Sequence, residues 1–241
     1  MLAGGSRAAE AAAGTPHFTY VLVHGATGGG WGFKEVDRLL TADGHKVYRP
    51  TLTGLGEKVH LASPAINLTT HITDIVNLIL WEDLHDVVLV GHSYGGMVIT
   101  GVMDRVPERI KHVIFLDALV PNDGESCDAA WGYQPSAAEA ALDFIPLDHR
   151  VPTRVPHAVP QPARTYRESV TFRNPAALKL PATYILTYDK GTKPEADDFY
   201  RFYERARTRG WALLMLEGPH TAHRSQPAEV AALLEKAVTG K

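Results

Sequence analysis

The chain contains a single cysteine, Cys127, so it cannot form an internal disulfide and offers no cysteine cluster to a metal. It also lacks any apolar run near the ~18 residues that span a bilayer. Neither sign of charge dominates, because 24 Lys and Arg stand against 27 Asp and Glu, for a net charge of −3. This balance provides no basic field, so we expect no nucleic-acid partner and no membrane span.

Ligand motifs for metals and nucleotides are missing as well. The chain has 12 histidines, but none forms a pair with the spacing of H-E-x-x-H. The glycine-rich stretch 24–32 follows a predicted strand, yet it contains neither G-x-x-x-x-G-K-[ST] nor G-x-G-x-x-G with an acid about 20 residues later. We therefore expect no metal, no nucleotide and no other cofactor.

Strand-like and helix-like segments alternate along the chain. Such alternation, with strands that are apolar throughout, predicts an α/β fold: a mostly parallel sheet, buried on both sides, with helices on both faces. The predicted strands are 18–23, 46–49, 87–90, 112–116, 183–187 and 211–216, and the predicted helices are 33–40, 68–84, 97–106, 196–207 and 227–238.

Composition divides the chain into a core and two other parts. Residues 1–16 are rich in Ala and Gly without the apolar core of a secretory signal, so we expect a disordered leader. Residues 121–181 hold nine prolines and show weak periodicity, which is typical of a functional insertion. We expect a cap there, inserted after the strand that ends near Leu116, and a core made of 17–120 and 182–241.

The stretch Val87–Thr100 contains the motif Gly91-His92-Ser93-Tyr94-Gly95 between a β-branched run and an apolar helix-like segment. A G-x-S-x-G sequence at a strand-to-helix turn is the pattern of a nucleophile elbow, which exposes its serine at the end of the sheet. The glycines allow the strained backbone that such a turn needs. Ser93 is therefore the predicted nucleophile.

A serine nucleophile needs a histidine base and a carboxylate that orients it, in the chain order Ser, acid, His. His220 follows the last predicted strand and is the preferred base, with His223 as the alternative. Asp189, after the strand 183–187, is the preferred acid, and Asp117, at the end of the strand 112–116, is the alternative. Both positions lie at carboxyl ends of strands, where active-site loops begin.

The developing oxyanion requires backbone N–H donors, one from the residue after the nucleophile and one from the glycine loop after the first strand. These positions correspond to Tyr94 and Ala26. Aromatic residues of the predicted cap suggest a mostly apolar pocket and small, largely apolar ester substrates. The predicted pocket residues are Thr27, Trp131, Tyr133 and Phe144.

Six segments together resemble the α/β-hydrolase superfamily, and within it the small-cap serine esterases similar to plant methylesterases and hydroxynitrile lyases and their bacterial relatives. They are VLVHGATGGGWGF, YRPTLTGLGE, VVLVGHSYGGMV, FLDALVPNDGES, DKGTKPEADDF and GPHTAHRSQPAEV. The resemblance runs from about Phe18 to Val238. It implies an α/β-hydrolase fold and a catalytic triad of Ser93, His220 and Asp189.

The sequence departs from this family's pattern at three places. The lyases carry a threonine in the glycine loop and a lysine after the catalytic histidine, where this chain has Gly25 and Thr221. The segment around Asp189 is a residue short, and some bacterial relatives keep only an aspartate like Asp117. The resemblance thus favours a serine esterase with a small-molecule ester substrate, and a lyase activity or a small-molecule receptor remains an alternative. Separately, we expect a cytoplasmic location, with secretion and a homodimer left open.

Overall fold

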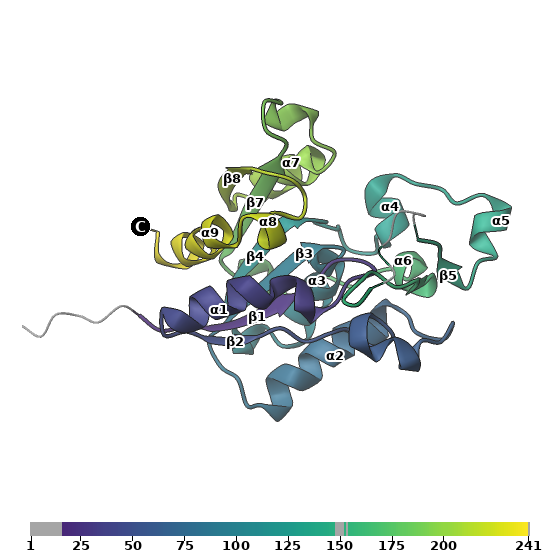
Figure 1. Cartoon of the computed structure of the whole chain (residues 1–241), viewed down its shortest axis with the longest axis horizontal. Coiled ribbons are helices and arrows are strands. Elements are labelled where there is room, and N and C mark those ends of the chain that lie inside the picture. The colour runs from purple at the N-terminus through teal and green to yellow at the C-terminus, as the bar shows by residue number, and fades with distance from the viewer. Residues whose placement is uncertain (1–15, 148–151, 153, 241) are drawn as a thin grey trace, which may run out of the picture.

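The computed structural model describes residues 16–147, 152 and 154–240, so almost all of the predicted leader lies outside the described residues. In this part of the chain, six strands form one sheet in the order β2-β1-β3-β4-β7-β8, and every neighbouring pair is parallel (Figure 1). The strands are β1 (Thr19–Val23), β2 (Lys46–Tyr48), β3 (Val87–Ser93), β4 (Ile110–Ala118), β7 (Ala182–Tyr188) and β8 (Ala212–Glu217). The predicted fold class is confirmed.

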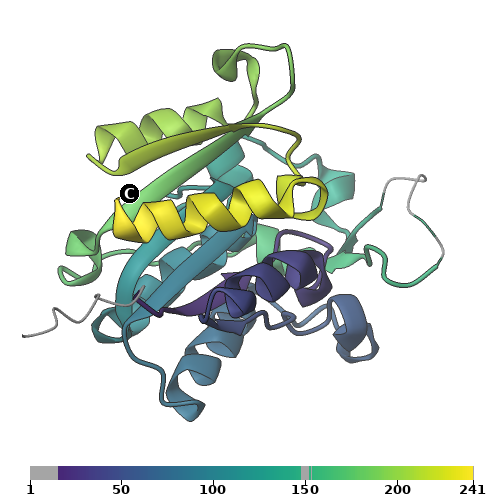
Figure 2. The same cartoon turned by 60° about the vertical axis from the view of Figure 1, so that its left-hand side comes forward.

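Helices cover both faces of this sheet. One face carries α1 (Lys34–Ala42), the short α8 (Ala222–Ser225) and α9 (Pro227–Thr239), and Figure 2 shows α9 lying across it. The other face carries α2 (Leu68–Trp81), α3 (Gly95–Arg105) and α7 (Tyr200–Thr208). Among the described residues, no helix is both long and apolar enough to cross a membrane.

The two-sided packing explains the continuous apolar runs of the strands. In β1, Tyr20 and Leu22 belong to the core beneath α1 and α9, whereas Val21 and Val23 belong to the core beneath α2 and α3. All four side chains are fully buried. Successive side chains of a strand point to opposite faces of the sheet. Where helices cover both faces, all of these side chains are buried, so the strand is apolar throughout instead of alternating between apolar and polar residues.

The chain between β4 and β7 contains the segment 121–181 that the sequence predicts as a cap. Most of it stands at one end of the molecule, beside the loop that follows β1 (Figure 1). Its elements are small: α4 (Cys127–Trp131), α5 (Ala137–Ala140), β5 (Phe144–Ile145), the antiparallel β6 (Gln161–Pro162), α6 (Arg164–Arg167) and the 3₁₀ turn η4 (Ala177–Lys179). Their brevity accounts for the weak periodicity of this part of the sequence.

Each predicted strand and long helix occurs, with shifted ends. The predicted helix 196–207 starts only at Tyr200, because residues 194–196 form a separate 3₁₀ turn, η5 (Pro194–Ala196). The predicted loop 51–64 contains another 3₁₀ turn, η2 (Gly56–Leu61), and two more are η1 (Gly30–Phe33) and η3 (Pro107–Arg109). The strand predicted at 87–90 continues to Ser93 as β3, so the nucleophile position is the last residue of a central strand.

Candidate active site

Ser93 lies at a sharp turn between β3 and α3, as the elbow pattern predicts. Its φ of 54° is in the left-handed region, which is costly for a residue with a side chain. The turn is also tightly packed: a Cβ at Gly91 would lie 2.8 Å from the Gly95 carbonyl oxygen, and one at Gly95 would lie 2.7 Å from the Val23 carbonyl oxygen. The glycines are therefore required by close backbone approach, and the strained turn presents the serine hydroxyl at the carboxyl end of the sheet.

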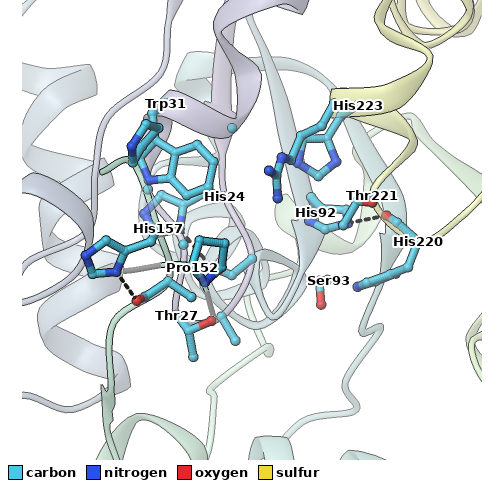
Figure 3. A pocket seen from close by; sticks show the side chains of 18 residues that line it. His24, Thr27, Trp31, His92, Ser93, Pro152, His157, His220, Thr221 and His223 are labelled. Carbon is cyan, nitrogen blue, oxygen red and sulfur yellow. Dashed lines mark hydrogen bonds between the residues drawn. The ribbon is translucent and has the colours of Figure 1, made fainter. Parts of the chain in front are cut away.

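A cavity of about 530 Å³ opens at this turn, and Ser93 and His220 both line it (Figure 3). His220 reaches it from the loop between β8 and α8, as its position after the last strand predicts. The loop after β1 forms another part of the wall, through residues that include Ala26 and Thr27. The predicted nucleophile, the preferred base and the glycine loop thus line one cavity, although they come from three separate parts of the chain.

His220 is bound to the carboxylate of Asp117. Its Nδ1 atom lies 2.6 Å from Asp117 Oδ2, and the Asp117 side chain is fully buried. Thr187 of the next strand holds the same carboxylate through its backbone N–H, 3.0 Å from Oδ1, and its hydroxyl, 2.7 Å from Oδ2. The hydrogen bonds from Thr187 therefore fix the Asp117 carboxylate while it accepts the hydrogen bond of the His220 imidazole.

An irregularity of β4 aims Asp117 at this histidine. Ser93 pairs with Ala118 while His92 pairs with Leu116, so Asp117 is an extra residue in the ladder between β3 and β4. Its φ of 43° is positive. A bulge of this kind turns a side chain away from its regular direction, and here it directs the carboxylate toward the neighbouring loop.

The preference for Asp189 as the partner of His220 is corrected by this geometry. Asp189 follows β7 in an exposed turn, where its carbonyl oxygen accepts hydrogen bonds from the backbone N–H and hydroxyl of Thr192. It lines a different surface cleft together with Glu217 and Gln226. The turn carries its side chain outward, so the histidine instead meets Asp117, the alternative acid on the strand beside the nucleophile.

Two further contacts hold the His220 loop. The ring of Phe199 stacks on the imidazole, with centroids 4.5 Å apart. His92, the residue before the nucleophile, donates from Nε2 to the His220 carbonyl oxygen at 2.8 Å. Burial holds the pKa of His92 well below its usual value, so it is a neutral donor. The strand that presents Ser93 is therefore tied directly to the loop that carries His220.

His223, the alternative base, packs away from the carboxylate. Its ring lies against Phe33 and His92, with centroid distances of 4.7 and 4.3 Å. Burial lowers its pKa to about 3, and its Nδ1 has no hydrogen-bond partner among the described residues. A histidine without an orienting acid and with so low an affinity for protons is poorly suited to take a proton from serine.

The loop after β1 is fastened to the segment 121–181. Thr27 has a φ of 59°, donates its backbone N–H to Gln161 Oε1 at 2.7 Å, and accepts at its carbonyl oxygen from the Val159 N–H at 2.9 Å. Ala26, the residue before it, lines the cavity beside Ser93. On the other side, Tyr94 begins the turn into α3. Ala26 and Tyr94 therefore belong to two elements that both border Ser93, and their role as oxyanion donors stays a prediction.

The aromatic residues predicted to line the pocket lie elsewhere, so this part of the prediction is wrong. Trp131 packs edge-on against Phe199 and Phe202, with centroids 4.9 and 5.0 Å apart. Trp131 and Tyr133 line another cavity within the insertion, and Phe144 belongs to β5. Only Thr27 of the predicted set reaches the cavity at Ser93.

Sequence reasoning missed several residues that do line the cavity, among them Trp31, His157 and Arg224. Trp31 and Arg224 lie inside two of the family-like segments, so their proximity to catalytic positions was an available signal. His157 comes from the aperiodic insertion, where the sequence gives no direction for a side chain. Within the described residues, no group of three or more His, Cys, Asp or Glu is arranged to hold a metal ion.

Comparison with known proteins places these observations in a family. The sequence pattern of the alpha/beta hydrolase family matches residues 20–233. A carbendazim hydrolyzing esterase from Nocardioides sp. (strain SG-4G) is 50% identical over 107 residues, which cover 44% of each chain. Methylesterase 1 of Arabidopsis thaliana is 36% identical over 142 residues, 53% of this chain and 51% of the relative. The matched regions thus span about half or less of these relatives.

Solved structures resemble the chain over nearly its whole length. An extracellular alpha/beta-hydrolase from a Paenibacillus species has a TM-score of 0.75 at 25% identity, with 91% of this chain and 98% of that chain covered. A methylesterase from Arabidopsis has a TM-score of 0.72 at 25% identity, with 93% and 100% covered. The similarity therefore includes the sheet, the helices on both faces and the inserted segment.

Proposed function

The chain belongs to the alpha/beta hydrolase family, and from this premise we propose that it is a serine hydrolase that cleaves small carboxylic esters through an acyl-enzyme on Ser93. The observation that carries the proposal is the 2.6 Å contact between His220 and the buried Asp117, at a cavity that Ser93 also lines. The esterases among the relatives support the same reaction class.

In this mechanism the Ser93 hydroxyl attacks the ester carbonyl while the free Nε2 of His220 takes its proton. The Asp117 carboxylate fixes the imidazole with its proton on Nδ1 and stabilises the imidazolium that forms. The backbone N–H groups of Ala26 and Tyr94 stabilise the oxyanion. The imidazolium then protonates the leaving alcohol, and water, activated in turn by His220, releases the acid and restores the serine.

The segment 121–181 serves, in this proposal, as the cap over the site. Pro152, Pro156 and His157 line the cavity, and the backbone contacts of Thr27 with Val159 and Gln161 join the segment to the oxyanion loop. If the segment shapes the site, limited proteolysis within it will abolish ester turnover. Full activity after complete cleavage there would contradict a role as cap.

A series of p-nitrophenyl esters with increasing acyl length tests the proposed reaction. We expect the wild-type chain to hydrolyse short esters, Ser93→Ala to be inactive, and Ser225→Ala, which removes an exposed hydroxyl outside the cavity, to behave as wild type. A covalent adduct with an organophosphonate, detected by mass spectrometry on Ser93, would identify the acyl-enzyme route. Cyanohydrin cleavage without an adduct would indicate a lyase, and ligand binding without turnover would indicate a receptor.

A further inference from the structure

Arg224 places a guanidinium group at the cavity that contains Ser93 and His220. It lies in the short helix α8, which follows the His220 loop, and its side chain is part of the cavity lining. The guanidinium carbon lies 4.9 Å from the centroid of the Trp31 ring. Trp31 lines the same cavity, as Figure 3 shows. This cation–π contact holds the guanidinium against one wall of the site.

The guanidinium of Arg224 has no carboxylate partner in the described part of the chain. Several other arginines bind carboxylates: Arg49 binds Asp37 at 2.8 Å and Arg109 binds Asp83 at 2.8 Å. Among the described residues, the Arg224 side chain contacts the Trp31 ring and makes no hydrogen bond or ion pair. Its planar fork of N–H donors is thus free to bind an external group, and such a fork matches a carboxylate best.

The rest of the cavity wall leaves this positive charge unopposed. No Asp or Glu occurs among the described lining residues, and Asp117 is completely buried behind His220. The pKa values of His24 and His223 are lowered by burial to about 4 and about 3, so both rings are neutral near pH 7. Near neutral pH the described wall therefore attracts anions through Arg224.

We propose that Arg224 determines substrate specificity by binding a free carboxylate of the substrate, so that the preferred substrates are esters that carry a second, unesterified carboxyl group. The inference rests on the proposed esterase function and narrows its substrate class. It also replaces the expectation of largely apolar substrates, which depended on aromatic residues that lie away from this cavity. Trp31 restricts the guanidinium before the substrate arrives, which lowers the entropic cost of binding.

A matched pair of esters tests this proposal: the mono-p-nitrophenyl ester of glutaric acid, which is anionic, and p-nitrophenyl pentanoate, which is neutral and of similar length. We expect Arg224→Gln to lower kcat/KM for the anionic ester about tenfold or more, and to change the neutral ester by less than about twofold. Arg38→Gln, which removes an exposed arginine of α1 paired with Glu35, provides the control for net charge and should alter neither. Added salt should weaken the wild-type preference.

Equal effects of Arg224→Gln on the two esters, or no effect on either, would overturn the proposal while leaving the esterase function intact. Hydrolysis of neither ester by the wild type would instead contradict the proposed function. In that event, binding of glutarate is measured by Trp31 fluorescence, which is identified as the signal that Trp31→Phe loses. Salt-sensitive quenching of this fluorescence in the wild type, and its absence in Arg224→Gln, would support the carboxylate site. No binding of glutarate by the wild type overturns it.

Discussion

Asp117 and His220 are joined at 2.6 Å although 103 positions separate them in the chain. The aspartate is the next-to-last residue of the strand beside that of Ser93, and the histidine follows the last strand of the sheet. In a parallel sheet all carboxyl ends meet at one edge, so side chains from distant segments converge there. The bulge at Asp117 completes this convergence, because it directs the carboxylate toward the imidazole.

The first prediction concerns the identity of the acid. We expect Asp117→Asn to lower kcat by a factor on the order of 10⁴ with the fold retained, because an amide cannot stabilise the imidazolium or keep the required tautomer. Asp189→Asn, which changes an exposed turn, is the matched control and should stay within about twofold of wild type. Steady-state ester kinetics and circular dichroism measure both. An inactive Asp189→Asn together with an active Asp117→Asn would restore the assignment first favoured by the sequence.

A second prediction treats His92 as a positioning residue. Its Nε2 donates to the His220 carbonyl oxygen at 2.8 Å, so His92→Leu should let the His220 loop shift and lower kcat by about 10- to 100-fold with little change in KM. His92→Gln retains an N–H donor and should recover most of the loss. A pH–rate profile that changes in His92→Leu and returns in His92→Gln would distinguish positioning from general destabilisation. Identical kinetics of the two variants would argue against the role.

The nucleophile and its histidine could be found from the sequence because their signals are local. The strand, the tight turn and the helix around Ser93 all lie within Val87–Thr100, and His220 is marked by its place after the final strand. The acid could not be chosen this way, since Asp117 and Asp189 both follow strands. A bulge directs the Asp117 side chain toward His220, whereas a turn carries the Asp189 side chain outward. Both features form only when the strands assemble into the sheet.

The pocket was predicted least well, for a physical reason. In the segment 121–181 the elements are so short that no periodicity shows which side chains face the core. Trp131 buries its apolar ring against Phe199 and Phe202, which follow β7 in the chain. The residues next to Trp131 in the sequence give no sign of this long-range contact. Arg224 lies between His220 and the predicted helix 227–238, and no periodicity there shows whether a charged side chain faces solvent or the site.

A third prediction concerns stability at acid pH. Burial lowers the pKa values of His24 and His71 to about 4, from 6.5 in the unfolded chain. The unfolded state therefore binds protons first, so the stability from these residues is complete above about pH 6.5 and declines as the pH falls toward 4, by about 1.4 kcal/mol per histidine per pH unit. Urea unfolding at pH 7.5, 6.0 and 5.0 measures this slope. His71→Gln should flatten it, and an unchanged slope would show that His71 titrates normally.

The last prediction separates His220 from His223. Because His223 is buried, has a pKa lowered to about 3 and leaves Nδ1 without a partner in the described structure, it contributes an unpaired polar atom to the core. An unpaired buried polar atom lowers the free energy of unfolding by about 1–3 kcal/mol, and His223→Leu, which introduces an apolar side chain of similar size, removes this penalty. Changes in packing around the leucine offset part of the gain. We expect kcat within about threefold of wild type and equal or greater resistance to urea, whereas His220→Leu should lose ester turnover on the order of 10⁴-fold or more. If His223→Leu were inactive and His220→Leu active, with both folded by circular dichroism, the proton would pass through His223, and Asp117 would orient a residue that is not the base.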